Sequence, residues 1–226
     1  MIDKRYSRNF KALSEEDQYK LFDSSVCVVG CGGLGGYIIE ILARLGVGKI
    51  TAVDGDVFDE TNLNRQLLSE DALIGKEKAL AAETRVAGIN PNVKLTPVVK
   101  FLTAENGEDI IKGHDIVIDA LDSAEARIVL KDICRKLDLI MIHGAIGGWH
   151  GQLSVVRPED EIIEKLYGGG FESDSKELGN PSFIPPVIAS LEVTECVKVL
   201  LGKGSPLYGK LLAIDLLEEE FEVIDF

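Results

Sequence analysis

The sequence predicts an α/β fold in which helices cover both faces of a mostly parallel β-sheet. Short apolar runs at residues 26–29 and 116–119 have the character of buried strands, and segments with helical periodicity follow them. Strands that alternate with helices along a chain pair in parallel, because each helix returns the chain to the starting edge of the sheet. The 226 residues are enough for one core, so we expect a single domain over residues 1–226.

A helix is expected before the first strand. Ser14 and Asp17 have the spacing of a capping box, which predicts a helix over residues 15–22. A second helix follows the strand at residues 26–29 directly, because apolar residues recur there at helical spacing. The other elements expected in the first half are a strand at 49–53, a polar connection at 57–75, a helix at 76–89, a strand at 94–99 and a short helix at 104–111.

The second half is expected to end in an antiparallel extension of the sheet. A glycine-rich connection at residues 144–150 suits an antiparallel return between two strands. Residues 167–182 show mixed charges and no periodicity, so we expect a mobile loop there. The remaining elements expected are strands at 116–119, 139–143, 151–157 and 210–215, and helices at 124–137 and 184–201.

A glycine motif marks the first strand–helix junction. Gly30, Gly32 and Gly35 form G-x-G-x-x-G, which allows a tight turn and lets a phosphate approach the free N–H groups of the helix N-terminus. The motif alone also fits close packing of a strand on a helix. Asp54 follows the second strand, where a Rossmann-type fold carries its ribose-binding acid. The context therefore favours a nucleotide site.

Two cations and two amides follow the second strand. Taken singly, Arg65 and Lys78 are compatible with solvated surface charges, but they stand together with Asn62 and Gln66 in the segment after the glycine turn. A dinucleotide needs little cationic help at a helix end. Cleavage of a nucleoside triphosphate is different, because negative charge builds up on the transferred phosphorus and on the leaving group. The sequence therefore favours triphosphate chemistry.

Two aspartates lie at the end of the strand at residues 116–119, at the sheet edge where α/β proteins bind ligands. Asp122 has no evident structural task and suits Mg²⁺, which prefers oxygen ligands. Asp119 suits either that site or the capping of local backbone groups. Structural roles are expected for the three histidines, because none has a Cys or Ser partner at a diagnostic spacing; these are His114, His143 and His150.

Composition narrows the class of protein. A formal charge of −14 argues against a nucleic-acid-binding surface, which needs clustered Lys and Arg. The chain contains no apolar run of membrane-spanning length and no secretory signal, so a cytoplasmic location is expected. No C-x-x-C pair is present, so no zinc site is expected. Of the four cysteines, burial is expected for Cys27, Cys134 and Cys196, and Cys31 lies inside the glycine turn.

Several motifs resemble those of the ThiF/MoeB/HesA family, which is related to the adenylating halves of ubiquitin-activating enzymes. The glycine turn resembles its G-x-G-G-L-G, and Asn-Leu-Asn-Arg-Gln at residues 62–66 matches its highly specific N-L-x-R-Q. The resemblance spans residues 5 to about 201. Further matches are R-Y-x-R at 5–8, D-x-D at 54–56, G-x-x-K at 75–78, Asn-Pro at 90–91, D-x-x-D at 119–122, and Gly144, Gly151 and Gln152.

The resemblance implies an activity. The family uses ATP and Mg²⁺ to adenylate the C-terminal glycine carboxylate of a small β-grasp sulfur-carrier protein ending in Gly-Gly, of the ThiS or MoaD type. It implies that Asp54 binds the ribose, Asp122 binds Mg²⁺, and Arg8 reaches the partner's site in a homodimer. The residues expected at the nucleotide are Gly30, Gly32, Gly33, Leu34, Gly35, Asp54, Asp56, Asn62, Arg65, Gln66 and Lys78, and those expected in catalysis are Arg8, Arg65, Lys78 and Asp122.

The chain departs from the family pattern in three ways. It lacks the paired zinc motifs and is shorter, residues 167–183 contain no cysteine, and Leu121 and Ser123 replace the commoner Thr and Asn of D-x-T-D-N. A separate sulfur donor is therefore expected. Three alternatives stay open: a relative that activates a small-molecule or tRNA carboxylate, an NAD-linked oxidoreductase, and a non-catalytic interaction subunit.

Overall fold

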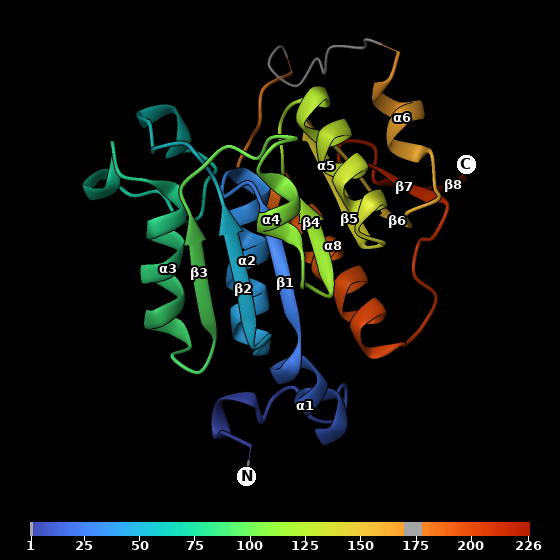
Figure 1. Cartoon of the computed structure of the whole chain (residues 1–226). Coiled ribbons are helices and arrows are strands. Elements are labelled where there is room, and N and C mark those ends of the chain that lie inside the picture. The colour runs from blue at the N-terminus through green and yellow to red at the C-terminus, as the bar shows by residue number, and fades with distance from the viewer. Residues whose placement is uncertain (1, 170–177) are drawn as a thin grey trace.

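The computed structural model describes residues 2–169 and 178–226, which form a single eight-stranded sheet with helices on both faces (Figure 1). The strand order is β3-β2-β1-β4-β5-β6-β7-β8. The first five strands in this order pair in parallel and the last four pair antiparallel, which confirms the expected α/β class. Their bounds are β1 Ser25–Val29, β2 Lys49–Val53, β3 Lys94–Val98, β4 Ile116–Asp119, β5 Ile140–Gly147, β6 His150–Val156, β7 Lys210–Asp215 and β8 Glu220–Asp225.

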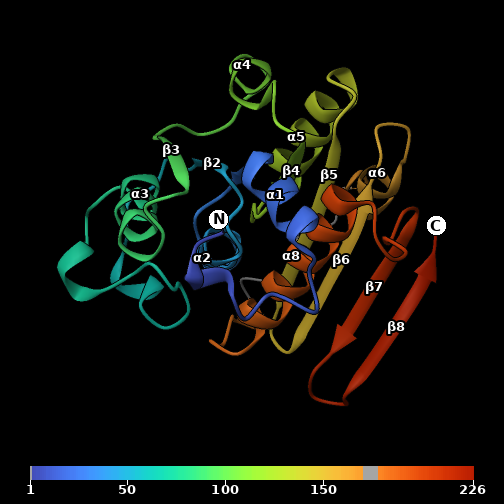
Figure 2. The same cartoon turned by 90° about the horizontal axis from the view of Figure 1, so that it is seen from below.

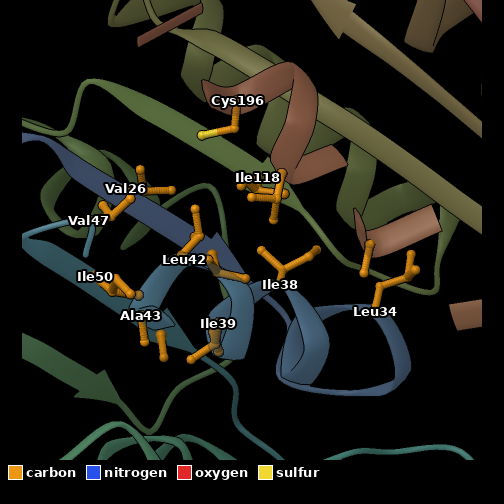
Figure 3. Close-up of a cluster of buried hydrophobic side chains, with 14 of the residues drawn as sticks. Val26, Leu34, Ile38, Ile39, Leu42, Ala43, Val47, Ile50, Ile118 and Cys196 are labelled. Carbon is orange, nitrogen blue, oxygen red and sulfur yellow. The ribbon is translucent and has the colours of Figure 1, made fainter. Parts of the chain in front are cut away.

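The helices divide between the two faces (Figure 2). One face packs α2, α3 and α8 against the apolar side chains of β1, β2 and β4, and this cluster includes Ile38, Leu42 and Cys196 (Figure 3). The other face packs α5 and α6 over residues such as Val117 and Met141. The helices are α1 Glu15–Asp23, α2 Gly33–Leu45, α3 Lys78–Ile89, α4 Gly107–Ile111, α5 Ala124–Lys136, α6 Ile162–Tyr167 and α8 Ile184–Leu201.

Local signals explain where the helices begin and end. The capping box expected at α1 is present, because Ser14 and Asp17 exchange hydrogen bonds. Gly46 ends α2 in the left-handed conformation, with φ of 87°, and Gly202 ends α8 in the same way. None of the helices in the described part of the chain combines the length and apolar character needed to cross a membrane.

The strand β5 differs from the expected one. The glycine-rich segment 144–150 was expected to be a connection, but β5 runs on to Gly147 and only Gly148 and Trp149 separate it from β6. Gly144 lies within the strand because the buried Glu192 carboxyl of α8 fills the place of a side chain: a Cβ there would meet it at 2.3 Å. Only residues 140–143 of β5 pair with β4, so its last four residues extend past β4 and pair with β6 alone.

Two elements were not expected at all. The helix α6 has only six residues, too few for a helical repeat to be recognised although Ile162, Ile163 and Tyr167 are buried. Every residue of β8 is exposed, so this strand lacks the alternation of buried and exposed positions that identifies a strand in a sequence. The helix α3 begins at Lys78 rather than at residue 76, and α4 begins at Gly107 rather than at 104. The mobile loop expected at 167–182 lies partly outside the described residues.

Candidate functional site

A cavity of about 670 Å³ opens at the carboxyl ends of β1, β2 and β4. Parallel strands present the following loops at this edge, which is where α/β sheets bind ligands. We call one side of the cavity the glycine wall. It consists of the turn at residues 30–35 and of Asp54, and its members on the cavity surface are Gly30, Gly32, Gly33, Leu34 and Asp54. We call the other side the network wall, formed by Arg127, Gln152 and Tyr167.

The glycines of the glycine wall have two different tasks. A Cβ at Gly30 would lie 2.4 Å from the Ala120 oxygen and one at Gly35 would lie 1.8 Å from the Gly30 oxygen, so these two permit close backbone packing. Gly32 and Gly33 line the cavity, and the nearest protein atoms to a Cβ there would lie at 3.6 and 3.9 Å. Among residues 2–169 and 178–226, no side chain caps the N-terminus of α2. The turn is therefore an open cradle for an anion at a helix end.

Asp54 holds the glycine wall together. Its Oδ2 accepts a hydrogen bond from the Cys31 N–H at 2.7 Å, and its Oδ1 accepts one from the Asp56 N–H at 2.8 Å. Burial raises the pKa of the Asp54 carboxyl, against the lowering effect of these two hydrogen bonds. The sequence predicted a ribose ligand here, and the structure adds a fixing role for the turn that the motif did not reveal.

Lys78 supplies a buried cation at the cavity. Its Nζ lies 3.2 Å from the Asp56 Oδ2, and the side chain of Lys78 is 8% exposed whereas that of Asp56 is 57% exposed. Both residues line the cavity. The ammonium group is thus held in place by one solvated carboxylate, which leaves its other donors for an anionic ligand.

The other residues of the N-L-x-R-Q stretch are placed differently from one another. Arg65 lines the cavity and donates through Nη1 to the Thr61 carbonyl at 2.9 Å. Gln66 also lines the cavity and is buried, and its Oε1 has no donor among the described residues. The side chain of Asn62 is not on the cavity surface: its Oδ1 accepts from the Asp59 N–H at 3.1 Å and caps a short 3-10 turn.

Asp122 lines the cavity beside the loop that follows β4. Within residues 2–169 and 178–226 it makes no hydrogen bond and no ion pair, and no group of three or more His, Cys, Asp and Glu side chains forms a metal site. A single free carboxylate fits Mg²⁺ bound to a nucleotide, because that ion keeps waters and takes most other ligands from phosphates. The donor chemistry at this position therefore fits the magnesium that the sequence suggested.

The network wall rests on a buried group of polar side chains. The Asp119 Oδ2 lies 2.7 Å from the His143 Nδ1, and the His143 Nε2 lies 3.1 Å from the Tyr167 hydroxyl. Arg127 packs its guanidinium over the Tyr167 ring, 4.9 Å from the centroid, and donates to the Leu121 carbonyl. Burial lowers the pKa of His143 despite the neighbouring Asp119, so the ring is neutral at physiological pH. His143 has the structural role expected of it.

Arg8 lies away from this cavity within one chain. It is exposed and does not line the cavity. The neighbouring Arg5 donates through Nη1 to the Asn90 Oδ1 at 2.8 Å, and Asn90 precedes the start of β3. The N-terminal segment therefore lies at the opposite end of the sheet from the glycine turn, as Figure 1 shows.

Several cavity residues escaped the sequence analysis, among them one cation and two aromatic side chains. Arg127 and Tyr167 line the cavity but have no motif of their own, and Phe101 covers Gly55, where a Cβ would meet its ring at 2.7 Å. Of these residues, only Arg127 could have been predicted from the sequence, because it lies in the first turn of the helix that follows D-x-x-D. The four cysteines are all buried, which confirms the expectation for Cys27, Cys134 and Cys196.

Known proteins resemble this chain over nearly its whole length. The SAMP-activating enzyme E1 of Haloferax volcanii is 35% identical over 228 residues, which cover 98% of this chain and 84% of that protein. The sulfur carrier protein adenylyltransferase of Thermus thermophilus is 34% identical over 229 residues, which cover 96% and 84%. A crystal structure of E. coli MccB with AMPCPP and MccA superimposes on this chain with a TM-score of 0.84 at 22% sequence identity. The match covers 99% of this chain and 71% of the MccB chain, so the two proteins share a fold.

The family assignment rests on the sequence as a whole. The ThiF family matches residues 6–226. The proteins from Haloferax volcanii and Thermus thermophilus both exceed 30% identity over almost the entire chain. The fold agrees, because the parallel and antiparallel halves form one sheet and the glycine turn lies at the cavity at its edge. The chain therefore belongs to the ThiF family, as its motifs predicted.

Proposed function

We propose that this protein is an ATP-dependent adenylyltransferase that activates the C-terminal glycine carboxylate of a small β-grasp sulfur-carrier protein. The relatives named as a sulfur carrier protein adenylyltransferase and a SAMP-activating enzyme support the reaction class. The observation that carries the proposal is a cavity that brings together an open helix N-terminus, the buried Lys78 ammonium and the Asp122 carboxylate, which has no partner among the described residues. This set of groups fits a nucleoside triphosphate together with the terminal carboxylate of the carrier protein.

The geometry supports an order of events. The triphosphate binds at Gly32 and Gly33, with the ribose toward Asp54. A carboxylate oxygen of the carrier attacks the α-phosphorus, the bond to the bridging oxygen breaks, and pyrophosphate leaves with its electron pair. Arg65 and Lys78 stabilise the charge that builds up on the phosphates. Mg²⁺, held by Asp122, would neutralise phosphate charge when bound.

The proposal includes a homodimer in which Arg8 of each chain completes the partner's site. Arg8 is exposed and is not among the residues that line the cavity of its own chain. A closed two-fold dimer brings such a segment to the second copy. A separate sulfur donor is part of the proposal, because all four cysteines of the chain are buried. A cytoplasmic location is also part of it, supported by the fact that the four cysteines are free, as is usual in a reducing compartment.

Exchange of labelled pyrophosphate into ATP tests the reaction. We expect Mg²⁺-dependent exchange that requires a carrier ending in Gly-Gly, and no exchange with a carrier shortened by its last glycine. Binding of NAD without any binding of ATP in calorimetry would instead favour an oxidoreductase. Exchange with a small carboxylic acid in place of the carrier would redirect the proposal to that substrate class.

Mixed dimers test the role of Arg8. The variants Arg8→Ala and Asp122→Ala should each be inactive alone, and a mixed dimer places both defects in one site and leaves the other intact. Random exchange makes half of the dimers mixed, so about a quarter of wild-type activity should return. A mixture that contains heterodimers by mass spectrometry but recovers no activity would remove Arg8 from the partner's site.

A further inference from the structure

Gln152 of β6 stands at the end of a chain of three hydrogen bonds that begins in the protein interior. Its Nε2 donates to the Tyr167 hydroxyl oxygen at 2.9 Å. The Tyr167 hydroxyl lies 3.1 Å from the His143 Nε2, and the His143 Nδ1 lies 2.7 Å from the Asp119 Oδ2. Asp119 and His143 are fully buried, whereas Gln152 lines the cavity.

In each of these three hydrogen bonds, only one assignment of donor and acceptor is possible. Asp119 accepts from the Leu121 N–H through Oδ1 and faces the Arg127 Nε through Oδ2 at 3.6 Å, so its carboxylate accepts from the His143 Nδ1–H. Burial lowers the pKa of His143, and the neutral ring then offers Nε2 as an acceptor. The Tyr167 hydroxyl must donate to Nε2, and burial raises its pKa, so it keeps its proton. Its oxygen is left as an acceptor for an N–H group.

The amide of Gln152 is therefore held in one orientation. Tyr167 itself is fixed by Arg127 on one ring face and by His143, whose ring centroid is 5.5 Å away in an edge-on arrangement. One N–H of the Gln152 Nε2 is committed to Tyr167, which fixes the plane and the direction of the amide. Its Oε1 has no donor among residues 2–169 and 178–226, and it is left to the cavity as a fixed hydrogen-bond acceptor.

The fixed acceptor selects a ligand that carries a donor. A triphosphate and a terminal carboxylate offer only acceptor oxygens, so neither pairs with the Oε1. The ribose and the base attached to it also carry donors, but the proposed ribose position is at Asp54, directly after β2. The order β2-β1-β4-β5-β6 puts four strand spacings, about 19 Å, between β2 and β6. A peptide that brings its carboxylate to the α-phosphorus carries backbone N–H groups instead.

We propose that the Oε1 of Gln152 binds a backbone N–H within the last two residues of the carrier tail, and that Asp119, His143 and Tyr167 are positioning residues that fix this acceptor. The inference rests on the proposed function and names how the same site holds its protein substrate. The contact orients the terminal carboxylate toward the α-phosphorus. It also distinguishes a peptide from a free small acid, which has no such N–H.

Amide-to-ester replacement tests the contact without adding bulk. Semisynthetic carriers in which an ester oxygen replaces the N–H of the last or of the penultimate glycine are compared with the natural carrier in pyrophosphate exchange. One of the two esters should raise KM about 3- to 10-fold with wild-type protein, the size expected for one lost hydrogen bond. Gln152→Ala should raise KM for the natural carrier by a similar factor, and that ester should add nothing further.

The positioning role has its own readout. Tyr167→Phe removes the acceptor that orients the Gln152 amide, so KM for the carrier should rise and the ester penalty should shrink, while kcat and the ATP dissociation constant stay near wild type. Tyr208→Phe is the matched control, because this tyrosine contacts Arg157 and does not line the cavity. Melting temperatures verify that the variants fold.

Other outcomes would overturn the inference. Exchange with unchanged KM for both ester carriers, or ester and Gln152→Ala penalties that simply multiply, would show that the two groups do not meet, while the proposed function would stand. A weaker ATP affinity in Gln152→Ala would assign the acceptor to the nucleotide. No exchange with any carrier would overturn the proposed function and this inference together.

Discussion

The glycine wall and the network wall enclose the same cavity but are held in place by different kinds of interaction. The glycine wall is fixed by its backbone: the Gly30 N–H donates to the Val53 carbonyl at 2.8 Å, and Asp54 ties down the Cys31 N–H. The network wall is fixed by side chains from β4, α5, β5, β6 and α6. A backbone wall tolerates substitution only at the positions that face the cavity, whereas a side-chain wall depends on every member of its network.

The largest effect is expected on the cation beside the glycine wall. Replacing Lys78 by Ala should lower the exchange rate by about 10²–10³-fold, the usual consequence of losing one charge-stabilising group. Lys76→Ala is the matched control, since Lys76 is exposed and should stay near wild type. Pyrophosphate exchange at saturating ATP measures both. Equal losses in the two variants would mean that burial of the ammonium group does not matter.

Close packing within the glycine wall gives the next effect. Gly35→Ala puts a methyl group 1.8 Å from the Gly30 oxygen, so the turn must shift. We expect the free energy of unfolding to fall by about 1–3 kcal/mol and the affinity for ATP to fall as well. In Gly33→Ala the nearest atom is 3.9 Å away, so stability should hold while ATP affinity falls. Denaturant unfolding and calorimetry separate the two results; identical stability in both variants would contradict this division of tasks.

A buried acid behind the network wall gives a pH-dependent effect. The Glu192 carboxyl has no partner among the described residues, and burial raises its pKa well above 4.5, with Asp119 adding to the rise and Arg127 opposing it. Above pH 4.5 the unfolded chain loses this proton and the folded one keeps it, so wild-type stability falls as pH rises, by up to about 1.4 kcal/mol per pH unit.

Glu192→Gln removes that titration. The free energy of unfolding of the variant should rise relative to wild type between pH 5 and pH 8, and the difference between them should narrow toward pH 4. Urea unfolding at a series of pH values measures it. A difference that stays constant over this range would show that the Glu192 carboxyl titrates as it does in the unfolded chain.

Replacing a cysteine is expected to have the smallest effect, because neither wall presents a thiol that could act as a nucleophile. All four thiols are buried, and burial raises the pKa of Cys134 to about 12 and that of Cys196 above its ordinary value. Reactive thiols are exposed and have a lowered pKa. Native protein should therefore react with no thiol reagent until it unfolds, and Cys196→Ser should leave exchange unchanged. A thiol-sensitive adduct with the carrier on a non-reducing gel would contradict this.

The same contrast explains what the sequence could predict. The glycine wall is built from residues close together in the chain. The spacing of residues in the sequence therefore predicted its motif, the helix that follows and the position of Asp54. The network wall joins Asp119 to Tyr167 across three intervening elements, and no spacing rule connects them. Gln152 was noticed only through a motif match, and its orientation depends on a histidine tautomer that only the folded chain determines.

Strand and helix bounds were predicted best in long or strongly apolar elements with a buried side. The strands at Lys49–Val53 and Ile116–Asp119 and the helix Ile184–Leu201 agree with expectation residue for residue. The prediction was wrong at 144–147, because glycine in a strand usually indicates a turn and here it accommodates the Glu192 carboxyl. It missed β8, because an exposed edge strand has no buried alternation to detect.

The part of the β5–β6 hairpin that extends beyond β4, which we call the shelf, has a length that can be changed. Four residues at about 3.3 Å each extend the β5–β6 hairpin roughly 13 Å past the end of β4. Side chains alternate between faces with a period of two, so adding or removing residues in matched pairs on both strands would lengthen or shorten the shelf and keep every remaining side chain on its face. Protein engineers therefore have a means of fitting longer or bulkier acceptors without touching the nucleotide half of the sheet.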